Sequence, residues 1–329
     1  MVPTSDLKEI IHRLNYLRGL FAILIVMGHC SMAFEKELLP FFIIHKFNMV
    51  GVCFFFYISA LSITYNFYNK QGYLKHFVRN KIVFFIVIAC VSLLVGNLLK
   101  TIFLQVPLYF NLTLLTTLNW YVYEMLVFYF LFFLLYSLID TSVHREILMT
   151  VITLCICLIT IYFDRYGSWT GWTKSYYLSC FSFPFGIVMG EHYDRIKRKF
   201  CKHGLIYSSA LFLVSLGCCI SLILPDSNLG GVLLKNFMGI CVMALVTVFV
   251  SFINVQSIPI VGSIISFLTK QSAEIYLYQF SVLDIVQKLY ERNNMAIDIS
   301  YILFSVAGVC VIAYMMRYID VWIAGKIKV

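Results

Sequence analysis

The chain has 329 residues, of which 61% are hydrophobic and only 12% are charged, a composition that excludes a soluble globular protein. Its net charge of +9 does not indicate a nucleic-acid partner, because Lys and Arg concentrate in alternate loops, as the positive-inside rule requires. The eleven cysteines fall mainly in apolar runs and show neither the spacing of a disulfide framework nor that of a zinc site, so we expect no bound metal.

Several apolar runs of about 18 to 22 residues follow one another, each long enough to cross the hydrocarbon core of a bilayer. We therefore predict an all-α, polytopic membrane protein with about ten transmembrane helices and a single domain over residues 1–329. An even number of spans places both termini on one side, and the distribution of Lys and Arg makes that side the cytoplasm. The expected spans are 14–34, 50–68, 82–99, 120–139, 147–163, 176–190, 204–224, 232–253, 272–290 and 300–318.

The first span, 14–34, follows a polar and basic segment, 1–13, and contains two polar residues of special interest, Arg18 and His29. On a straight α-helix eleven residues rise about 16 Å and return to within roughly 20° of the starting direction, so both side chains share one face. The arginine is then expected at the water boundary and the imidazole deep in the apolar layer. Ionisable groups at that depth are costly and indicate a functional site.

His29 is the one histidine of seven that lies well inside a predicted span. One interpretation is a core histidine that forms a hydrogen bond to a neighbouring helix. The other is a general base that takes a proton from an attacking hydroxyl, a role that suits imidazole because its pKa lies near working pH. We predict the second role for His29.

Arg18 also has a structural and a functional interpretation. In the structural one, an isolated arginine at the end of a span anchors the helix at the lipid headgroups. The basic loop 69–81 favours a binding role, since Lys75, Arg79 and Lys81 should lie on the same cytoplasmic face. Several fixed cations around a membrane entrance suit a phosphorylated ligand. A nucleotide bound there could extend a long arm toward His29, and coenzyme A has this shape.

Motifs in the first half of the chain resemble those of the acyltransferase-3 family of bacterial integral-membrane O-acyltransferases. LNYLRG at 14–19, with His29 at R-x10-H spacing, resembles the first helix of that family. CFFFYISAL at 53–61 resembles its FF-x-x-SG segment, with Ala60 where Gly is usual. Arg79 falls where the family has a basic motif after the second helix.

The remaining motifs follow in the order that the family shows. NWYVYE at 119–124, followed by Phe128 and Tyr129, resembles the family's Trp…Glu…Phe-Tyr helix. FPFG at 183–186 resembles its sixth helix. SAEIYLYQ at 272–279 resembles its S-x-x-IYL-x-H segment, with Gln279 in place of the customary histidine.

The resemblance implies an acyltransferase of the bacterial cytoplasmic (inner) membrane with no bound cofactor, whose donor is cytoplasmic acyl-CoA, most often acetyl-CoA. It implies an acceptor hydroxyl on a surface glycan or a lipid-linked sugar, so the expected partners are acyl-CoA, that acceptor and membrane lipids. It also implies that the Arg18 side engages the donor and that His29 is essential. From their position in the basic loop we expect Lys75, Arg79 and Lys81 to hold the donor phosphates together with Arg18. The oligomeric state stays open, with a homodimer among the alternatives.

Glu124 is a carboxylate in an apolar span, which is costly unless it has a partner. It either pairs with a cation such as Lys174 or acts beside His29, by orienting the imidazole or by binding sugar hydroxyls. We predict the second role, and Asp284 is a similar but weaker case. The predicted acceptor contacts are Asn119, Trp120, Tyr129 and Gln279.

A transporter or flippase for a lipid-linked saccharide is the alternative function, because it would also need a basic inner face. Secondary transporters often contain internal repeats and helices that are interrupted near the membrane midplane. Neither feature is evident in this sequence, so we favour direct acyl transfer, while an acyl-enzyme on serine or cysteine stays open.

Overall fold

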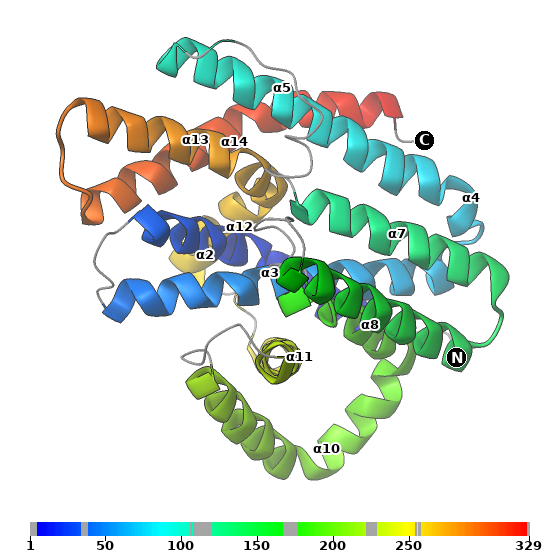
Figure 1. The fold of residues 1–329 in the computed structure, drawn as a ribbon. Helices are drawn as coiled ribbons and strands as arrows, with labels where there is room; N and C mark the ends of the chain where they lie inside the picture. The colour runs from blue at the N-terminus through cyan, green and yellow to red at the C-terminus, as the bar shows by residue number, and fades with distance from the viewer. Residues whose placement is uncertain are drawn as a thin grey trace.

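The computed structural model describes residues 5–33, 39–105, 107, 120–166, 177–221, 229–253, 255 and 258–327. Within these ranges the chain forms helices and no strand, which confirms the predicted all-α class (Figure 1). The helices are α1 (Ser5–Tyr16), α2 (Arg18–Cys30), η1 (Ser31–Ala33), α3 (Leu39–Asn69), α4 (Tyr73–Phe77), the π-helix η2 (Val78–Val83), α5 (Phe84–Leu104), α7 (Trp120–Leu138), α8 (Ser142–Tyr166), α10 (Ser182–Ser221), α11 (Leu229–Phe252), α12 (Pro259–Lys270), α13 (Ser272–Arg292) and α14 (Ile299–Ile327).

The number of membrane-spanning helices in the described part of the structure differs from the number predicted from the sequence. Seven helices in the described ranges are long and apolar enough to cross a bilayer, or eight if the bent helix α10 counts as one span, so the predicted ten is not confirmed. The sixth and seventh expected spans correspond to the segments Tyr177–Lys199 and Lys202–Gly217, which meet at 115° and lie mostly within α10. The ninth expected span is α13, which is long enough but too polar for that group of seven.

The first span begins earlier than its hydropathy indicates. Helix α1 takes up most of the polar N-terminal segment and buries Leu7, Ile10 and Leu14, which recur at helical spacing on one face. A turn at Leu17 separates α1 from α2, and the Leu17 amide donates to the Leu14 carbonyl at 2.9 Å. Arg18 therefore stands at a helix start rather than in the middle of one straight helix.

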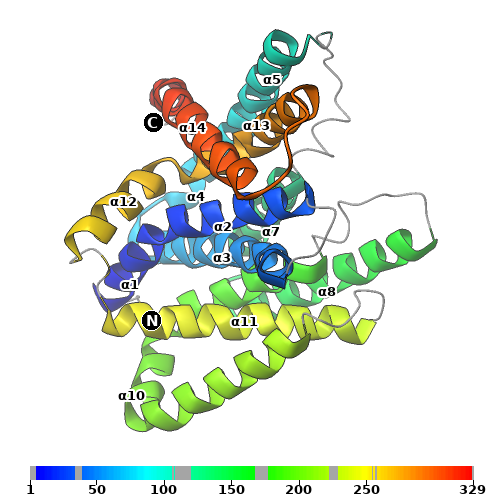
Figure 2. The same cartoon turned by 90° about the vertical axis from the view of Figure 1, so that its left-hand side faces the viewer.

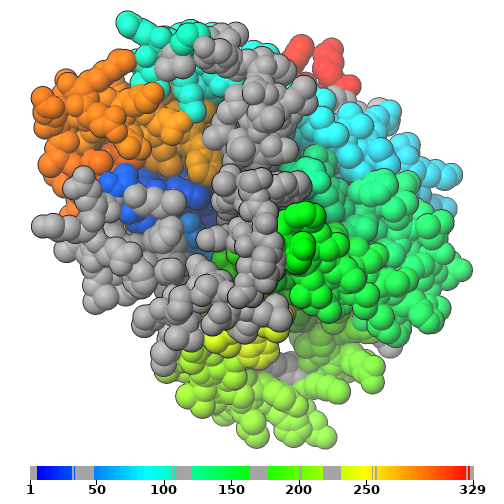
Figure 3. Space-filling view, viewed as in Figure 1, coloured from blue at the N-terminus to red at the C-terminus, as the bar shows by residue number. Residues whose placement is uncertain are grey.

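Helices α2 and α3 form the centre of the bundle. Phe21 stacks on Phe54 with ring centroids 4.0 Å apart, and a Cβ atom at Gly51 would lie only 2.5 Å from Cγ1 of Ile25. The glycine thus lets the two helices approach closely, antiparallel to one another. Little of the N-terminal helices, coloured blue, reaches the face drawn in space-filling form (Figure 3).

Both described ends of the chain lie at one end of the bundle (Figure 2), in agreement with an even number of crossings. The same end holds the turn from α3 to α4, the π-helix and the short apolar helix α12, and we call it the inner end. Asp6 of α1 pairs with Lys197 of α10 here, and Arg13 donates to the Val250 carbonyl near the end of α11. These contacts connect the N-terminal helix α1 to α10 and to α11.

Candidate functional site

A cavity of about 470 Å³ opens at the inner end, among α1, α2, α3, η2, α5, α7, α13 and α14. Three of the predicted site residues line it, namely Arg18, Lys81 and Tyr129. Most of its other polar wall consists of amide and hydroxyl side chains, which are Asn15, Ser59, Ser62, Tyr65, Asn66 and Asn80. We call it the Arg18 cavity.

Arg18 enters this cavity as the first residue of α2. Its guanidinium carbon lies 5.9 Å from the centre of the Phe55 ring, and its buried Nε atom has no hydrogen-bond partner in the part of the chain that the structure describes. Among the described residues no carboxylate approaches within ion-pair distance of Arg18. A half-buried guanidinium without a fixed counter-ion is well placed to receive an anionic group, which it could bind through two parallel hydrogen bonds.

The π-helix η2 brings Asn80 and Lys81 into the same wall. A π-helix is wider than an α-helix, is rare, and occurs frequently at functional sites. Lys75 and Arg79 belong to the same basic segment, but neither lines the Arg18 cavity. Both side chains are exposed, and Lys75 borders a separate surface depression formed by residues 67–75. Of the four cations predicted to hold the donor, the structure brings Arg18 and Lys81 together.

His29 lies near the other end of α2. Helices α12 and α13 follow α2 in the same direction, since the Gly19 amide donates to Oγ1 of Thr269 near the end of α12 at 3.3 Å and the His29 ring lies 4.7 Å from the ring of Phe280 in α13. The imidazole therefore packs against another helix of the bundle. It does not line the Arg18 cavity, whose residues lie nearer the inner end.

Three aromatic rings lie beyond the cavity, on the side toward His29. Phe55 and Tyr121 occupy positions on α3 and α7 that are deeper than the cavity residues Ile58 and Tyr129, and Tyr276 faces them from α13. The ring centroids are 6.2 Å apart for Phe55–Tyr121, 6.2 Å for Phe55–Tyr276 and 4.7 Å for Tyr121–Tyr276. We call these three packed rings, which come from three different helices, the aromatic layer.

Glu124 and Gln279 are buried polar side chains in this deeper part of the protein. Glu124 is 1% exposed and Gln279 is fully buried, and none of their side-chain oxygen or nitrogen atoms has a hydrogen-bond partner among the described residues. Such groups are costly and call for an explanation, either structural or functional. Trp120 begins α7 and is nearly buried, edge-on to Tyr121. Asn119, and Lys174 as a partner for Glu124, lie outside the described residues.

Two further carboxylates, Glu274 and Asp320, line the Arg18 cavity and were not among the predicted site residues. Each is 5% exposed. Glu124 was predicted as a site residue because a carboxylate in an apolar helix is costly. The same reasoning applies to Glu274 and Asp320 and could have identified both. Asp284, which that reasoning did single out, is half exposed and pairs with Lys100, so it has a structural explanation.

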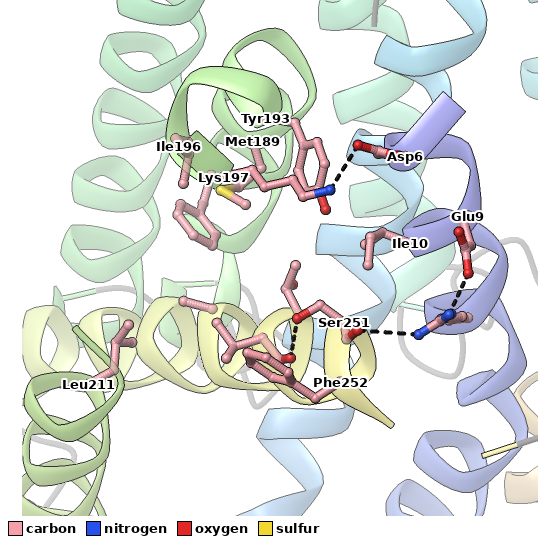
Figure 4. A pocket seen from close by; sticks show the side chains of 15 residues that line it. Asp6, Glu9, Ile10, Met189, Tyr193, Ile196, Lys197, Leu211, Ser251 and Phe252 are labelled. Atoms are coloured by element: carbon pink, nitrogen blue, oxygen red, sulfur yellow. Dashed lines mark hydrogen bonds and ion pairs between the residues drawn. The ribbon is translucent and has the colours of Figure 1, made fainter. Parts of the chain in front are cut away.

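A second cavity of about 460 Å³ lies among α1, α10 and α11 (Figure 4). Its floor is mostly apolar, with Met189, Ile196 and Phe252, and the ion pairs Asp6–Lys197 and Glu9–Arg13 stand at its edge. It shares no lining residue with the Arg18 cavity and contains none of the predicted site residues. The Arg18 cavity is therefore the candidate site.

The family model described as an acyltransferase domain, of the acyltransferase-3 family, matches residues 11–317, nearly the whole chain. The chain belongs to this acyltransferase-3 family. No curated protein and no solved structure is found to match it. The cavity, the cation at its wall and the histidine on α2 thus belong to a multi-pass membrane acyltransferase.

The structure accounts for one departure of this acyltransferase from the family pattern. A Cβ atom at Gly186 of α10 would lie 2.8 Å from the Cβ atom of Ala60 on α3 and 2.5 Å from the carbonyl oxygen of Tyr57. The two helices therefore keep a close contact although alanine replaces the usual glycine at position 60, because the facing residue is itself glycine. Gln279 is the second position that differs from the family motif. Its neutral amide side chain is fully buried where the motif has a histidine.

Proposed function

We propose that this acyltransferase moves an acetyl group from cytoplasmic acetyl-CoA to a hydroxyl of a cell-surface glycan or of its lipid-linked precursor. The observation that carries the proposal is helix α2 itself. It bears an arginine that has no ion-pair partner among the described residues, in a cavity at the inner end, and, about 16 Å further along, an imidazole within the bundle. The family supports acyl transfer, and the cationic wall supports a phosphorylated donor.

The donor is held at the inner end. Arg18 and Lys81 bind the phosphates of the nucleotide, while Asn15, Asn66 and Asn80 offer amide groups to its sugar and base. The arm then runs along α2 toward His29. It meets the aromatic layer of Phe55, Tyr121 and Tyr276 on the way, so binding of the donor requires at least one of these rings to change its rotamer.

The reaction takes place at His29. The imidazole accepts the proton of the acceptor hydroxyl as the oxygen attacks the thioester carbonyl, and the tetrahedral intermediate expels the CoA sulfur. The imidazolium then returns the proton to the sulfur, so that the products are the acetyl ester and free CoA. Glu124 stabilises the imidazolium or binds sugar hydroxyls with Trp120, and the amide of Gln279 donates to the acceptor or to the oxyanion.

Transfer of radiolabel from acetyl-CoA by membranes that contain the protein tests this function. His29→Ala should lower the rate about 10²- to 10⁴-fold, because a positioned general base contributes that much. His76→Ala, at an exposed histidine of α4, serves as the matched control and should keep the wild-type rate. Equal rates for His29→Ala and wild type, with equal membrane insertion, would contradict the proposed role.

The same preparation separates this function from lipid-linked saccharide transport. A transporter would move the saccharide across vesicle membranes without consuming the thioester, and free CoA would not accumulate. Release of CoA in proportion to ester formation is the expected result.

A further inference from the structure

Two carboxylates form part of the wall of the Arg18 cavity. Glu274 is the third residue of α13, and Asp320 lies near the end of α14. One oxygen of Glu274 faces the Arg317 guanidinium at 3.7 Å. Its other oxygen and both oxygens of Asp320 are buried and accept no hydrogen bond from any described residue. We call this pair the acidic wall.

Buried carboxylate oxygens without donors are costly, so the acidic wall indicates that donors are supplied from outside the protein. A bound metal ion is a poor explanation, because the described ranges hold no group of three or more histidine, cysteine, aspartate or glutamate side chains suited to one. A phosphate is disfavoured at this wall, because carboxylates offer it acceptors, whereas Arg18 and Lys81 offer cationic donors in the same cavity. The remaining ligand chemistry is an uncharged group that carries hydroxyl or amide N–H donors.

The position of the acidic wall along helix α2 determines which part of a bound ligand can contact it. Helices α12 and α13 follow α2 in the same direction, with Thr269 near the end of α12 beside Gly19 and Phe280 of α13 beside His29. Glu274 therefore lies at a depth between Arg18 and His29. A ligand with its phosphates at Arg18 and its reacting group at His29 must pass Glu274 with the part that joins the two.

We infer that Glu274 and Asp320 accept hydrogen bonds from the hydroxyl and amide N–H groups of the pantetheine arm of the donor. This inference rests on the proposed function, because it takes acyl-CoA as the ligand. Phosphates bind to the cationic wall of Arg18 and Lys81 and are repelled from the acidic wall. The two walls therefore fix the orientation of the donor, with its nucleotide at Arg18 and Lys81 and its thioester directed toward His29.

Glu274→Gln and Asp320→Asn test the inference, since each removes charged acceptor capacity while it keeps the shape of the side chain. The ligands are acetyl-CoA, acetyl-pantetheine, which has the arm but no nucleotide, and adenosine 3′,5′-bisphosphate, which has the nucleotide but no arm. Each variant should raise KM for both thioesters by about tenfold, as expected for the loss of a hydrogen bond to a charged group. The inhibition constant of adenosine 3′,5′-bisphosphate should stay at the wild-type value.

Glu291→Gln, at an exposed glutamate of the same helix, and Asp140→Asn, in the exposed turn between α7 and α8, are the matched controls and should leave every constant unchanged. Melting temperatures in detergent show which variants are folded. Should Glu274→Gln fail to fold because Arg317 loses its partner, Asp320→Asn decides the question, since Asp320 makes no ion pair with a described residue.

Two results would overturn the inference. One is an unchanged KM for both thioesters in folded Asp320→Asn protein. The other is weaker inhibition by adenosine 3′,5′-bisphosphate, which would place the nucleotide rather than the arm at the acidic wall. If the wild-type protein consumes neither thioester, the proposed function fails instead, and the two failures are thus distinct.

Discussion

Arg18 and Arg145 are both arginines at the inner end of the bundle, but their surroundings differ. Arg145 of α8 is 4% exposed, donates to the Tyr68 hydroxyl at 2.8 Å and lies 3.7 Å from a carboxylate oxygen of Glu191. Its guanidinium also sits 4.2 Å from the centre of the Tyr136 ring, and the Tyr136 hydroxyl donates to Glu191 at 2.7 Å. Arg18 has the Phe55 ring and no described ion-pair partner.

The comparison separates two uses of a cation in a membrane protein. The Arg145 cluster joins α3, α7, α8 and α10, and one terminal nitrogen of its arginine, Nη2, contacts both Tyr68 and Glu191. Arg18 lines a cavity and has no ion-pair partner among the described residues. We propose that Arg145 stabilises the fold and that Arg18 binds a ligand.

The largest expected effect is on stability, from Arg145→Ala. Removal of one partner of a buried ion pair costs about 3–5 kcal/mol, because the remaining charge, here that of Glu191, stays buried without its counter-charge. Thermal unfolding in detergent should therefore show a marked fall in the melting temperature. Arg145→Lys keeps the charge and should lose less. A variant that melts like the wild type would show that the cluster is not structural.

Arg18→Ala should change substrate binding rather than stability. KM for acetyl-CoA should rise about 10- to 100-fold, the range expected when a charged hydrogen-bonding group is lost, whereas the melting temperature should hardly change because no described ion pair is broken. Steady-state kinetics and thermal unfolding of the same preparation measure both. A destabilised Arg18→Ala protein with normal KM would remove the distinction between the two arginines.

The smallest effects are expected at the exposed cations. Lys75→Ala and Arg79→Ala should change KM for acetyl-CoA by less than about twofold, because exposed charges outside the cavity are screened by salt. Lys81→Ala, at a residue that lines the cavity, should raise KM by about fivefold. A titration of KM against ionic strength for all three variants makes the comparison. Equal effects would mean that the donor binds across the whole basic segment rather than in the cavity.

Most of the fold follows from the sequence because hydropathy reports directly which segments are long and apolar enough for the bilayer. The details that the structure adds depend on contacts. The bend of α10 joins two expected spans through a basic segment, residues 191–203, that was predicted as a loop but whose polar residues are compatible with helix. The π-helix and the turn at Leu17 have no hydropathy signal at all.

The candidate site was predictable in part. R-x10-H spacing places Arg18 and His29 on one helix, and the structure agrees, but the spacing cannot say that the cavity ends short of the imidazole. Lys75 and Arg79 are close to Lys81 in sequence yet point elsewhere, because helical geometry distributes neighbouring residues around the axis. Glu274 and Asp320 come from opposite ends of two antiparallel helices, so only tertiary packing brings them together.

One residue beside the cavity sets the spacing of its two walls. A Cβ atom at Gly19 would lie 2.4 Å from the backbone carbonyl carbon of Leu268 and 2.4 Å from the amide nitrogen of Thr269, at the junction that leads from α12 into α13. Any larger residue would push that junction outward and carry Glu274 with it. The absence of a side chain at Gly19 therefore determines the distance between Arg18 and Glu274. That distance limits how thick a molecule can pass between the two residues.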